Sequence, residues 1–454
     1  MASALLTDLY QLTMAHAYFE EGMRETAVFE LFVRQLPPQR RFLLAAGLER
    51  ALEFVGALRF TAADIEFLGA QGSFTPRFLD YLATLRFTGT VHAMSEGSPF
   101  FAEEPILRVT APIIEAQLLE SRILNIIHFQ TLIASKAARC VIAGNGRRLV
   151  DFGMRRAHEG DAALFLARAA YLAGFDGTAT VEAGRRWGIP VSGTVAHSYI
   201  ETHDDEEEAF RNFTRTAPGR TTLLIDTYDT RRAAEKVAHL QNELKAHGAA
   251  HGVDSVRIDS GDLGAQARAV RRILDGHGCR DIRIVLSGGL DEHQIAALVS
   301  SGAPVDAFGV GTSLGVSQDV PALDMVYKLQ MYAGRPRRKR SPDKATWPGI
   351  KQVVREYDTD GAALRDRIVL EGEKADGMPL LTEVMREGRV LAPSRPLEAI
   401  RSDCRRQMQA LPSYLLQLDD RPAGPSSSYP VIRSAAVDAL AATETGHAAA
   451  GNPA

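Results

Sequence analysis

The chain has little of several residue types that mark particular classes of protein. Only three of its 454 residues are cysteines, Cys140, Cys279 and Cys404. Their wide separation argues against a disulfide framework or a cysteine metal site and suits a reducing cytoplasm. The net charge at pH 7 is only −4, so no global charge favours nucleic acid or an anionic membrane. We therefore expect a cytoplasmic protein that binds neither.

Long hydrophobic runs are also missing. The most apolar early stretch, residues 42–48, is followed by Glu49 and Arg50 and is too short to span a bilayer. The N-terminus lacks the basic and apolar regions of a secretory signal. What is present is a composition with 45% hydrophobic and 24% charged residues. Such a balance, at this length, predicts a globular protein of two or three domains with a large core.

Between about residues 147 and 320, short apolar runs alternate with helical patterns. Apolar residues at helical spacing after Asp262 and after Asp291 predict two helices, and the first of them ends at Gly276. Repeated β-α units of this length predict a parallel sheet, and their number suits a TIM-like barrel. The expected strands cover residues 148–152, 187–192, 222–225, 255–258, 283–286 and 306–308.

The flanking segments have a different pattern. Residues 7–23 predict an amphipathic helix, 27–34 a strand, 88–110 short antiparallel strands, and 114–139 a long helix. Residues 321–415 return to strand and turn patterns, and we expect them to pack on the N-terminal segment. The predicted fold is an irregular TIM-like α/β barrel plus a discontinuous α/β sandwich domain. The expected domains are 1–140 with 325–420, 141–324 as the barrel, and 421–454 as a partly disordered tail.

A dense basic run occupies residues 335–340, Arg335-Pro-Arg-Arg-Lys-Arg340. No aromatic residues are interleaved with it, so it is a weak candidate for nucleic-acid binding. We interpret it as a solvated hairpin loop, with attraction of a polyphosphate as the alternative.

His197 stands in Gly193-Thr-Val-Ala-His197, just after the expected strand at 187–192. Loops at the carboxyl ends of parallel strands converge on one crevice, where barrel enzymes place their chemistry. A histidine there titrates near neutral pH and has nucleophilic ring nitrogens. A lone histidine at a strand end is more often structural, so its neighbours decide the interpretation.

Phe152 stands at the end of the strand at 148–152, and Arg155 follows shortly after. Together they could hold a planar anion by stacking and a charged hydrogen bond. The strand at 222–225 is followed by Asp226 and Asp229. These two carboxylates could hold Mg²⁺ or a ribose hydroxyl, or could simply begin a helix.

The strand at 255–258 contains Arg257 and is followed by Asp259 and Ser260. Side chains alternate along a strand, so Arg257 and Asp259 should lie on the same side. A cation, an anion and a hydroxyl close together predict a metal- or hydroxyl-binding cluster.

Two later strands end in glycine-rich turns. Gly288 and Gly289 follow one, and Gly311 and Thr312 follow the next. Such loops let backbone N–H groups approach an anion closely, so the substrate should carry phosphate.

These stretches resemble those of nicotinate phosphoribosyltransferase, a type II phosphoribosyltransferase, and occur in the same order along the chain as in that family. The resemblance covers about residues 4–415. The matching stretches are residues 7–14, Asp151-Phe-Gly-Met-Arg-Arg-Ala157, 174–178, 193–197, Ile258-Asp-Ser-Gly-Asp-Leu263, 287–290, Phe308-Gly-Val-Gly-Thr-Ser313, 323–329 and 348–352.

The resemblance implies a reaction and a set of roles. Nicotinate and phosphoribosyl pyrophosphate would give nicotinate mononucleotide and pyrophosphate, for NAD biosynthesis, in a homodimer with Mg²⁺. ATP would phosphorylate His197 transiently, and hydrolysis of that phosphohistidine would be coupled to synthesis. The family match assigns Tyr10, Phe152, Arg155, Thr194 and Arg257 to nicotinate, with Tyr10 entering the partner's site. It assigns Asp259 to the ribose, Ser260 to the phosphoribosyl group, and Gly288, Gly289, Gly311 and Thr312 to the 5′-phosphate.

One departure bears on specificity. The nicotinamide-using relative has an aspartate where this chain has Ala179, so nothing at that position repels a carboxylate and nicotinate is favoured. Position 196 is also an alanine where that relative has an acid, which leaves the group orienting His197 unidentified. The alternatives are a nicotinamide- or quinolinate-using phosphoribosyltransferase, a phosphate-binding barrel aldolase or isomerase, and a binding module without activity. No lysine ends any of the six runs, which disfavours an aldolase.

Overall fold

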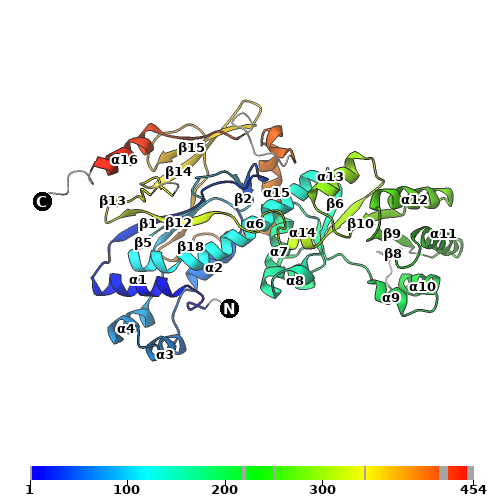
Figure 1. Cartoon of the computed structure of the whole chain (residues 1–454), viewed down its shortest axis with the longest axis horizontal. Helices are drawn as coiled ribbons and strands as arrows, with labels where there is room; N and C mark the ends of the chain where they lie inside the picture. The colour runs from blue at the N-terminus through cyan, green and yellow to red at the C-terminus, as the bar shows by residue number, and fades with distance from the viewer. Residues whose placement is uncertain (1–2, 217–220, 250–251, 342–343, 419–427, 447–454) are drawn as a thin grey trace. The chain divides into compact units, whose positions relative to one another are not determined.

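A computed structural model describes residues 3–216, 221–249, 252–341, 344–418 and 428–446. The chain divides into two compact units (Figure 1). The first unit combines the two ends of the chain, Met1–Leu132 and Ala322–Ala454, and the second is Ile133–Pro321.

The first unit is built around antiparallel strands. Its largest sheet has the order β13-β12-β1-β5-β3-β17-β18, and a second has the order β16-β14-β15-β19. Strand β1 pairs with β5 from the N-terminal segment and with β12 from the C-terminal segment, which makes the unit discontinuous in sequence. The strands are β1 (Thr26–Val33), β2 (Leu43–Leu44), β3 (Thr90–Ala93), β4 (Pro99–Phe100), β5 (Leu107–Pro112), β12 (Met325–Tyr332), β13 (Arg335–Pro336), β14 (Lys351–Tyr357), β15 (Ala363–Leu370), β16 (Met378–Pro379), β17 (Thr382–Arg386), β18 (Arg389–Val390) and β19 (Val431–Arg433).

Helices accompany these sheets, and one of them contains the boundary between the units. Helix α6 (Glu120–Gly144) is the one described helix long and apolar enough to cross a membrane by length and composition. Its apolar window is 78% buried, as the core helix of a folded domain would be, so this is weak evidence for a span. The others are α1 (Leu9–Glu20), α2 (Leu48–Gly56), α3 (Ala62–Ala70), α4 (Pro76–Thr84), α5 (Ile113–Leu118), α15 (Leu397–Gln409), α16 (Ala435–Gly446) and the 3₁₀ turn η2 (Ser413–Leu416).

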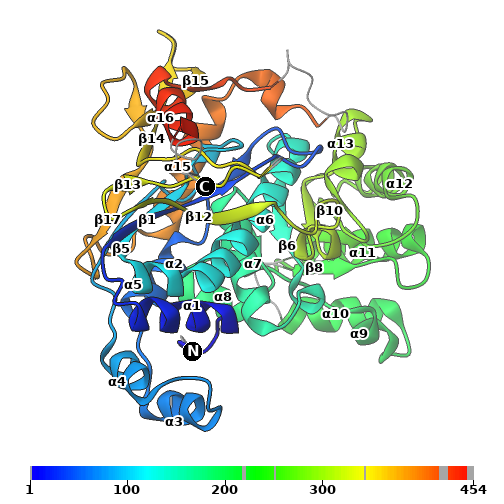
Figure 2. The ribbon, with the colours of Figure 1, turned by 60° about the vertical axis from the view of Figure 1, so that its left-hand side comes forward.

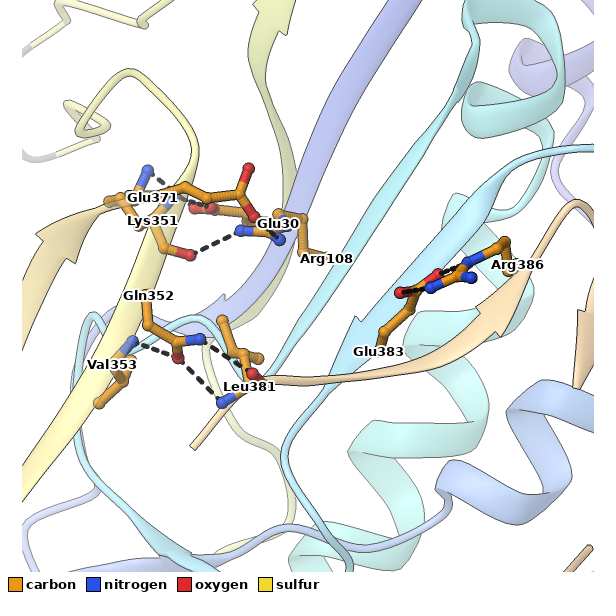
Figure 3. Close-up of polar contacts among 9 residues, drawn as sticks. All are labelled: Glu30, Arg108, Lys351, Gln352, Val353, Glu371, Leu381, Glu383 and Arg386. Atoms are coloured by element: carbon orange, nitrogen blue, oxygen red, sulfur yellow. Dashed lines mark hydrogen bonds and ion pairs between the residues drawn. The ribbon is translucent and has the colours of Figure 1, made fainter. Parts of the chain in front are cut away.

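A buried lysine links the two sheets of the first unit (Figure 3). Lys351, on β14, is 4% exposed, and its Nζ lies 2.7 Å from the Glu30 carboxylate on β1. Burial lowers the pKa of Lys351, and the Glu30 charge opposes that shift. Arg108 donates to the Lys351 carbonyl at 3.0 Å and to Glu371 at 2.5 Å, while Gln352 exchanges two hydrogen bonds with the Leu381 backbone. Glu30, Arg108 and Lys351, the buried charges of this cluster, therefore each have a partner, as burial requires.

The second unit is a parallel α/β domain. Its six strands have the order β7-β6-β11-β10-β9-β8, and α11 and α12 pack against β9. Figure 2 shows these two helices beside the strands of this unit. The strands are β6 (Arg148–Asp151), β7 (Gly177–Thr178), β8 (Thr221–Leu224), β9 (Val253–Ile258), β10 (Arg283–Leu286) and β11 (Ala307–Val310). The helices are α7 (Gly160–Leu172), α8 (Val181–Trp187), α9 (His197–Glu201), α10 (Glu206–Thr216), α11 (Thr230–Ala246), α12 (Leu263–Gly276), α13 (Glu292–Ser300), α14 (Thr312–Gly315) and the 3₁₀ turn η1 (Met154–Arg156).

The parallel sheet agrees with the repeated β-α pattern of the sequence. Asp262 caps α12 by accepting from Ala265 N, and Asp291 forms a capping box at α13. These caps explain why the two helices begin where the sequence predicts. Among the described strands, β7 and β8 are the edges of the sheet.

The strand predicted at residues 187–192 is wrong. Trp187 ends α8, Gly188 takes a left-handed conformation, and Pro190 has no N–H to donate. The segment pairs with the sheet only through an isolated bridge between Val191 and Thr178. Val191 is 47% exposed, so this segment is not a buried strand.

Residues 428–446, within the segment 421–454 that the sequence predicts to be a partly disordered tail, contain a strand and a helix. Strand β19 pairs in parallel with β15, and α16 follows it. Tyr429 stacks on Phe101 with ring centroids 4.1 Å apart and donates to Asp366 at 3.1 Å. These contacts to distant residues hold the segment in place. Residues 419–427 and 447–454 lie outside the described part.

Candidate active site

The parallel sheet of the second unit borders an open pocket of about 530 Å³. Alternate residues of β6 and β9 face it, as expected when side chains alternate along a strand. The pocket runs from the first residues of β6, β10 and β11 to Phe152, directly after β6, and residues 190–194 border it. Its lining includes Arg148, Val150, Phe152, Ser192, Gly193, Thr194, Thr222, Ser255, Arg257 and Val285.

A compact charged cluster lies at the end of β9. The Arg257 Nη2 atom donates to Asp259 Oδ1 at 2.5 Å, and Arg257 Nε donates to Ser287 Oγ at 2.7 Å. Ser287 Oγ in turn donates to Asp259 Oδ1 at 2.5 Å. The arginine side chain is 13% exposed and the aspartate 24%, so water screens this pair only partly. The expectation that Arg257 and Asp259 share one side of the strand is confirmed.

An aromatic face adjoins this cluster. The Phe152 ring centroid lies 5.4 Å from the Arg257 guanidinium carbon, within cation–π range. The ring also lies against the backbone of Gly309, where an added Cβ would come within 2.4 Å of a ring carbon. Glycine at 309 is therefore what lets Phe152 occupy this position.

Asp226 and Asp229 have different partners. Asp226 Oδ2 accepts from Asp259 N at 3.0 Å and from Ser260 Oγ at 2.6 Å. Its other oxygen, Oδ1, is buried and has no hydrogen-bond partner among the described residues. Asp229 instead caps α11 by accepting from Arg231 N and Arg232 N.

These carboxylates bear on the expected Mg²⁺. Mg²⁺ usually takes one or two protein carboxylates together with substrate phosphates. The unpaired Oδ1 of Asp226 fits that role, whereas the carboxylate of Asp229 is already used as a helix cap. Among the described residues, no group of three or more His, Cys, Asp or Glu side chains is placed to hold a metal ion.

His197 is the first residue of α9, and a nearby hydroxyl orients its ring. Its Nδ1 lies 3.1 Å from Thr227 Oγ1, in the loop after β8. When Nδ1–H donates to that oxygen, the Nε2 lone pair is left free. Thr227 thus supplies the orienting group that the sequence left unidentified. The only sequence signal for this role of Thr227 was its position after a strand, next to Asp226.

The glycine turns have the predicted geometry for close approach. At Gly288, φ is +92° and an added Cβ would lie 1.8 Å from the Asp259 carbonyl oxygen, so no other residue fits there. Gly289 is exposed beside it, and Gly311 precedes the single turn α14, which begins at Thr312. The exposed backbone of both turns is available to an anion.

The remaining predicted residues have different surroundings. Thr194 Oγ1 donates to the Thr222 carbonyl at 2.5 Å, which holds the loop before His197 against β8. Arg155 lies in η1, is exposed, and forms no ion pair with the described residues. Tyr10 belongs to the first unit, on α1, where it is 48% exposed and burial raises its pKa.

Sequence reasoning gave no role to Asp151 and did not identify Thr178 or Ser287. Asp151 is 1% exposed and accepts from Gly153 N and from Thr178 Oγ1, both at 2.7 Å. Burial raises the pKa of Asp151 to about 6. Its position next to Phe152 was visible in the sequence, but its partner is 27 residues away.

Comparisons with known proteins find matches along nearly the whole chain. A model of the nicotinate phosphoribosyltransferase N-terminal domain matches residues 5–128, and one of the nicotinate phosphoribosyltransferase family matches residues 147–333. A nicotinate phosphoribosyltransferase of Mycobacterium tuberculosis is 48% identical over 429 residues, covering 94% of this chain and 91% of the relative. A nicotinate phosphoribosyltransferase of Bacillus subtilis is 42% identical over 359 residues, covering 78% of this chain and 73% of the relative.

Solved structures agree as well. The crystal structure of human nicotinic acid phosphoribosyltransferase matches with a TM-score of 0.84 and 29% identity. The match covers 97% of this chain and 100% of the human one. The chain belongs to the nicotinate phosphoribosyltransferase family.

Proposed function

We propose that this protein is a nicotinate phosphoribosyltransferase that acts in NAD biosynthesis from nicotinate. The pyridine nitrogen would attack the anomeric carbon of phosphoribosyl pyrophosphate, and the bond from that carbon to pyrophosphate would break. The observation that carries the proposal is the Phe152–Arg257–Asp259 cluster beside the Gly288 turn, on one end of a parallel sheet. The irregular TIM-like barrel of the family is the proposed architecture around it.

Nicotinate recognition follows from the chemistry of that cluster. The pyridine ring would stack on Phe152, and its carboxylate would pair with Arg257, helped by Arg155 and the Thr194 loop. The Arg257 hydrogen bonds engage Nε and Nη2, and among the described residues none accepts from Nη1. Ala179, half-buried at the end of β7, brings no carboxylate that would repel the substrate. The site therefore favours nicotinate over nicotinamide.

The phosphoribosyl group would lie across the neighbouring strand ends. Gly288, Gly289, Gly311 and Thr312 would hold the 5′-phosphate through backbone N–H groups and a hydroxyl. Asp259 and Ser260 would bind the ribose side.

Catalysis at this site would depend on placement of charge. The transition state resembles an oxocarbenium ion, so positioning and electrostatics contribute more than a protein nucleophile. Mg²⁺ held by Asp226 would neutralise the leaving pyrophosphate.

ATP coupling would use His197. Its Nε2 would attack the γ-phosphorus of ATP, the bond to ADP would break, and water would later release phosphate. The contact of Nδ1 with Thr227 supports this role because it leaves Nε2 as the free nitrogen.

The family resemblance also leads us to propose a cytoplasmic homodimer with shared sites. Tyr10 would reach the partner's nicotinate site from α1, whose neighbouring side chains Leu6 and Leu9 are also exposed, at 54% and 66%. Mixed dimers of Tyr10→Ala and His197→Ala subunits would carry both lesions in one site. The other site would stay intact, so co-expression should restore about half of the coupled activity. No restoration on mixing would count against sharing.

The proposed reaction is tested with radiolabelled nicotinate. Purified protein, phosphoribosyl pyrophosphate and Mg²⁺ should convert the label to nicotinate mononucleotide, and ATP should increase the yield while being hydrolysed. Absence of labelled nucleotide with or without ATP would refute the proposal.

A further inference from the structure

Asp151 lies between two loops that border the proposed nicotinate site. It ends β6, directly before Phe152, and is 1% exposed. Its Oδ1 accepts from Gly153 N at 2.7 Å, in the turn that leads to Arg155. Its Oδ2 accepts from Thr178 Oγ1 at 2.7 Å, at the end of β7 and next to Ala179. One carboxylate therefore bridges the turn after β6 and the loop after β7.

The backbone around this bridge is held by short pairings on both sides. Strand β7 has two residues and pairs with β6 only at Val150↔Gly177 and Asp151↔Thr178. Ala179 N donates to the Asp151 carbonyl at 2.8 Å, and on the other side Thr178 pairs with the Pro190 carbonyl and Ser192 N. Thr180 N donates to Thr178 Oγ1 at 3.0 Å, so the same hydroxyl also fixes the start of the following helix. The side-chain bridge adds the link that ties the Ala179 loop to the turn after β6.

The turn after β6 is packed without free space. A Cβ added to Gly153 would lie 3.0 Å from Asp151 Oδ1 and 3.3 Å from the Gly311 carbonyl oxygen. Phe152 N donates to the Val310 carbonyl at 2.8 Å. A shift of the Asp151 carboxylate would thus disturb the neighbouring residue, Phe152.

The bridging carboxylate of Asp151 is unfavourable to bury in its charged form. Asp151 forms no ion pair with the described residues, and burial raises its pKa to about 6. A buried carboxylate without a cation costs stability, and an amide of the same shape would avoid that cost. Residues that keep such a cost often serve a site rather than the fold.

We propose that Asp151 and Thr178 are positioning residues that hold Phe152 and the Ala179 loop in place at the nicotinate site. This rests on the proposed function, because the ring they position is that of the substrate. Neither residue touches substrate in this account, and their effect should appear in nicotinate binding and not in the chemical step.

The first test compares Thr178→Val with Thr178→Ser. Valine keeps the shape but removes the hydroxyl, so the nicotinate KM should rise about tenfold, the scale of one lost hydrogen bond to a charged group. The kcat and the KM for phosphoribosyl pyrophosphate should change by less than about twofold, because uniform ground-state binding is what is lost. Serine should restore the nicotinate KM. Equal nicotinate KM values for the valine and serine variants would overturn the proposal.

The second test uses Asp151→Asn, whose amide does not titrate in this range and, like the protonated acid, offers one acceptor and one donor group. In wild type the nicotinate KM should rise as pH falls through about 6, because protonation turns the oxygen that faces Thr178 from an acceptor into a donor. The asparagine variant should lose this component, seen as the difference between the two pH profiles. Identical profiles would show that the titrating group lies elsewhere and would contradict the role of Asp151.

A third measurement needs no activity and so separates this proposal from the proposed function. Hydrogen exchange of the free protein should be faster in Thr178→Val than in Thr178→Ser for peptides covering residues 152–157 and 178–181. Faster exchange in a protein that forms no nucleotide would reject the proposed function and leave the bridge intact. Unchanged exchange in both peptides would reject the bridge itself.

Discussion

Asp259 Oδ1 lies 2.5 Å from Arg257 Nη2, so the cation proposed to bind nicotinate is already paired with an anion before substrate arrives. Ser287, which is 2% exposed, completes the triangle and fixes the arginine plane. The pairing holds the guanidinium in one orientation, which reduces the entropy lost when a carboxylate binds. It also balances the charge of the site.

The first prediction concerns Arg257. Arg257→Ala should raise the nicotinate KM by an amount equivalent to about 1.5–3 kcal/mol, because a charged hydrogen bond to the carboxylate is lost. Steady-state kinetics with nicotinate varied at saturating phosphoribosyl pyrophosphate would measure this. Arg272→Ala, at an exposed position on α12, is the matched control and should behave as wild type. An unchanged nicotinate KM with weaker phosphoribosyl pyrophosphate binding would move Arg257 to the phosphates.

The second prediction concerns the glycine below the aromatic ring. Gly309→Ala places a methyl group 2.4 Å from the Phe152 ring, so the ring must move. Overpacking of this kind costs about 1–3 kcal/mol, and the displaced ring should also weaken nicotinate binding. Thermal unfolding and the nicotinate KM measure the two effects. Gly276→Ala, at the end of helix α12, adds a methyl group in open space, so it should leave the KM unchanged and should not lower the unfolding temperature. A Gly309→Ala protein with wild-type KM would show that Phe152 does not stack on the substrate.

The third prediction concerns phosphate transfer. His197→Ala should abolish labelling of the protein by γ-³²P-ATP and retain some ATP-independent synthesis. Thr227→Val should reduce labelling, because Nδ1 loses the hydroxyl that fixes the ring 3.1 Å away. His239→Ala, at an exposed histidine of α11, is the control. Acid-labile phosphate at wild-type level in His197→Ala would place the phosphorylated group elsewhere.

The fourth prediction concerns stability and pH. Burial raises the pKa of Asp151 to about 6 in the folded protein, from its ordinary value of 3.8, so folding favours its protonated form. Its contribution to stability is therefore present below pH 4 and is lost as pH rises through 6. Over that window Asp151→Asn should become more stable than wild type, by about 1–3 kcal/mol at pH 8. Denaturant unfolding at pH 4, 6 and 8 measures the difference.

Asp281→Asn, at an exposed position, is the control for that measurement and should show no such trend. A destabilised Asp151→Asn protein at pH 8 would mean that the carboxylate serves the fold and not the substrate site.

Much of the second unit could be predicted from sequence because local signals mark its elements. Strand β10 was predicted at residues 283–286, as observed, because an apolar run stops at Ser287 and two glycines. Helix α12 begins after its cap Asp262 and ends at Gly276, as the pattern indicates. Such signals depend only on residues close in sequence, so they can be interpreted without knowledge of the fold.

One feature that the sequence did not reveal depends on contacts between distant residues, and one wrong strand has a local cause. Strand β19 is three residues long and exists because β15 offers an edge and Tyr429 packs on Phe101. No local pattern reveals that pairing. The apolar run at 187–192 has strand composition, but the turn at Gly188 and the missing N–H of Pro190 prevent a regular strand.

In the candidate site, contacts between residues close in sequence could be predicted and contacts between distant residues could not. Arg257 and Asp259 could be placed together because they are two residues apart on one strand. Ser287 and Thr227 could not, because each meets its partner across the sheet, 28 to 30 residues away. Asp151 lies in a stretch that matches the family, but its proposed positioning role depends on Thr178, which lies on another strand.

The central claim is that this site transfers a phosphoribosyl group to nicotinate. The most direct measurement offers the purified protein equal concentrations of nicotinate, nicotinamide and quinolinate with phosphoribosyl pyrophosphate, Mg²⁺ and ATP, and separates the nucleotide products. The account predicts nicotinate mononucleotide with stoichiometric pyrophosphate, consumption of nicotinate, and little use of the other two acceptors. Formation of nicotinamide mononucleotide as the main product, or nucleotide formed from quinolinate with release of carbon dioxide, would contradict it.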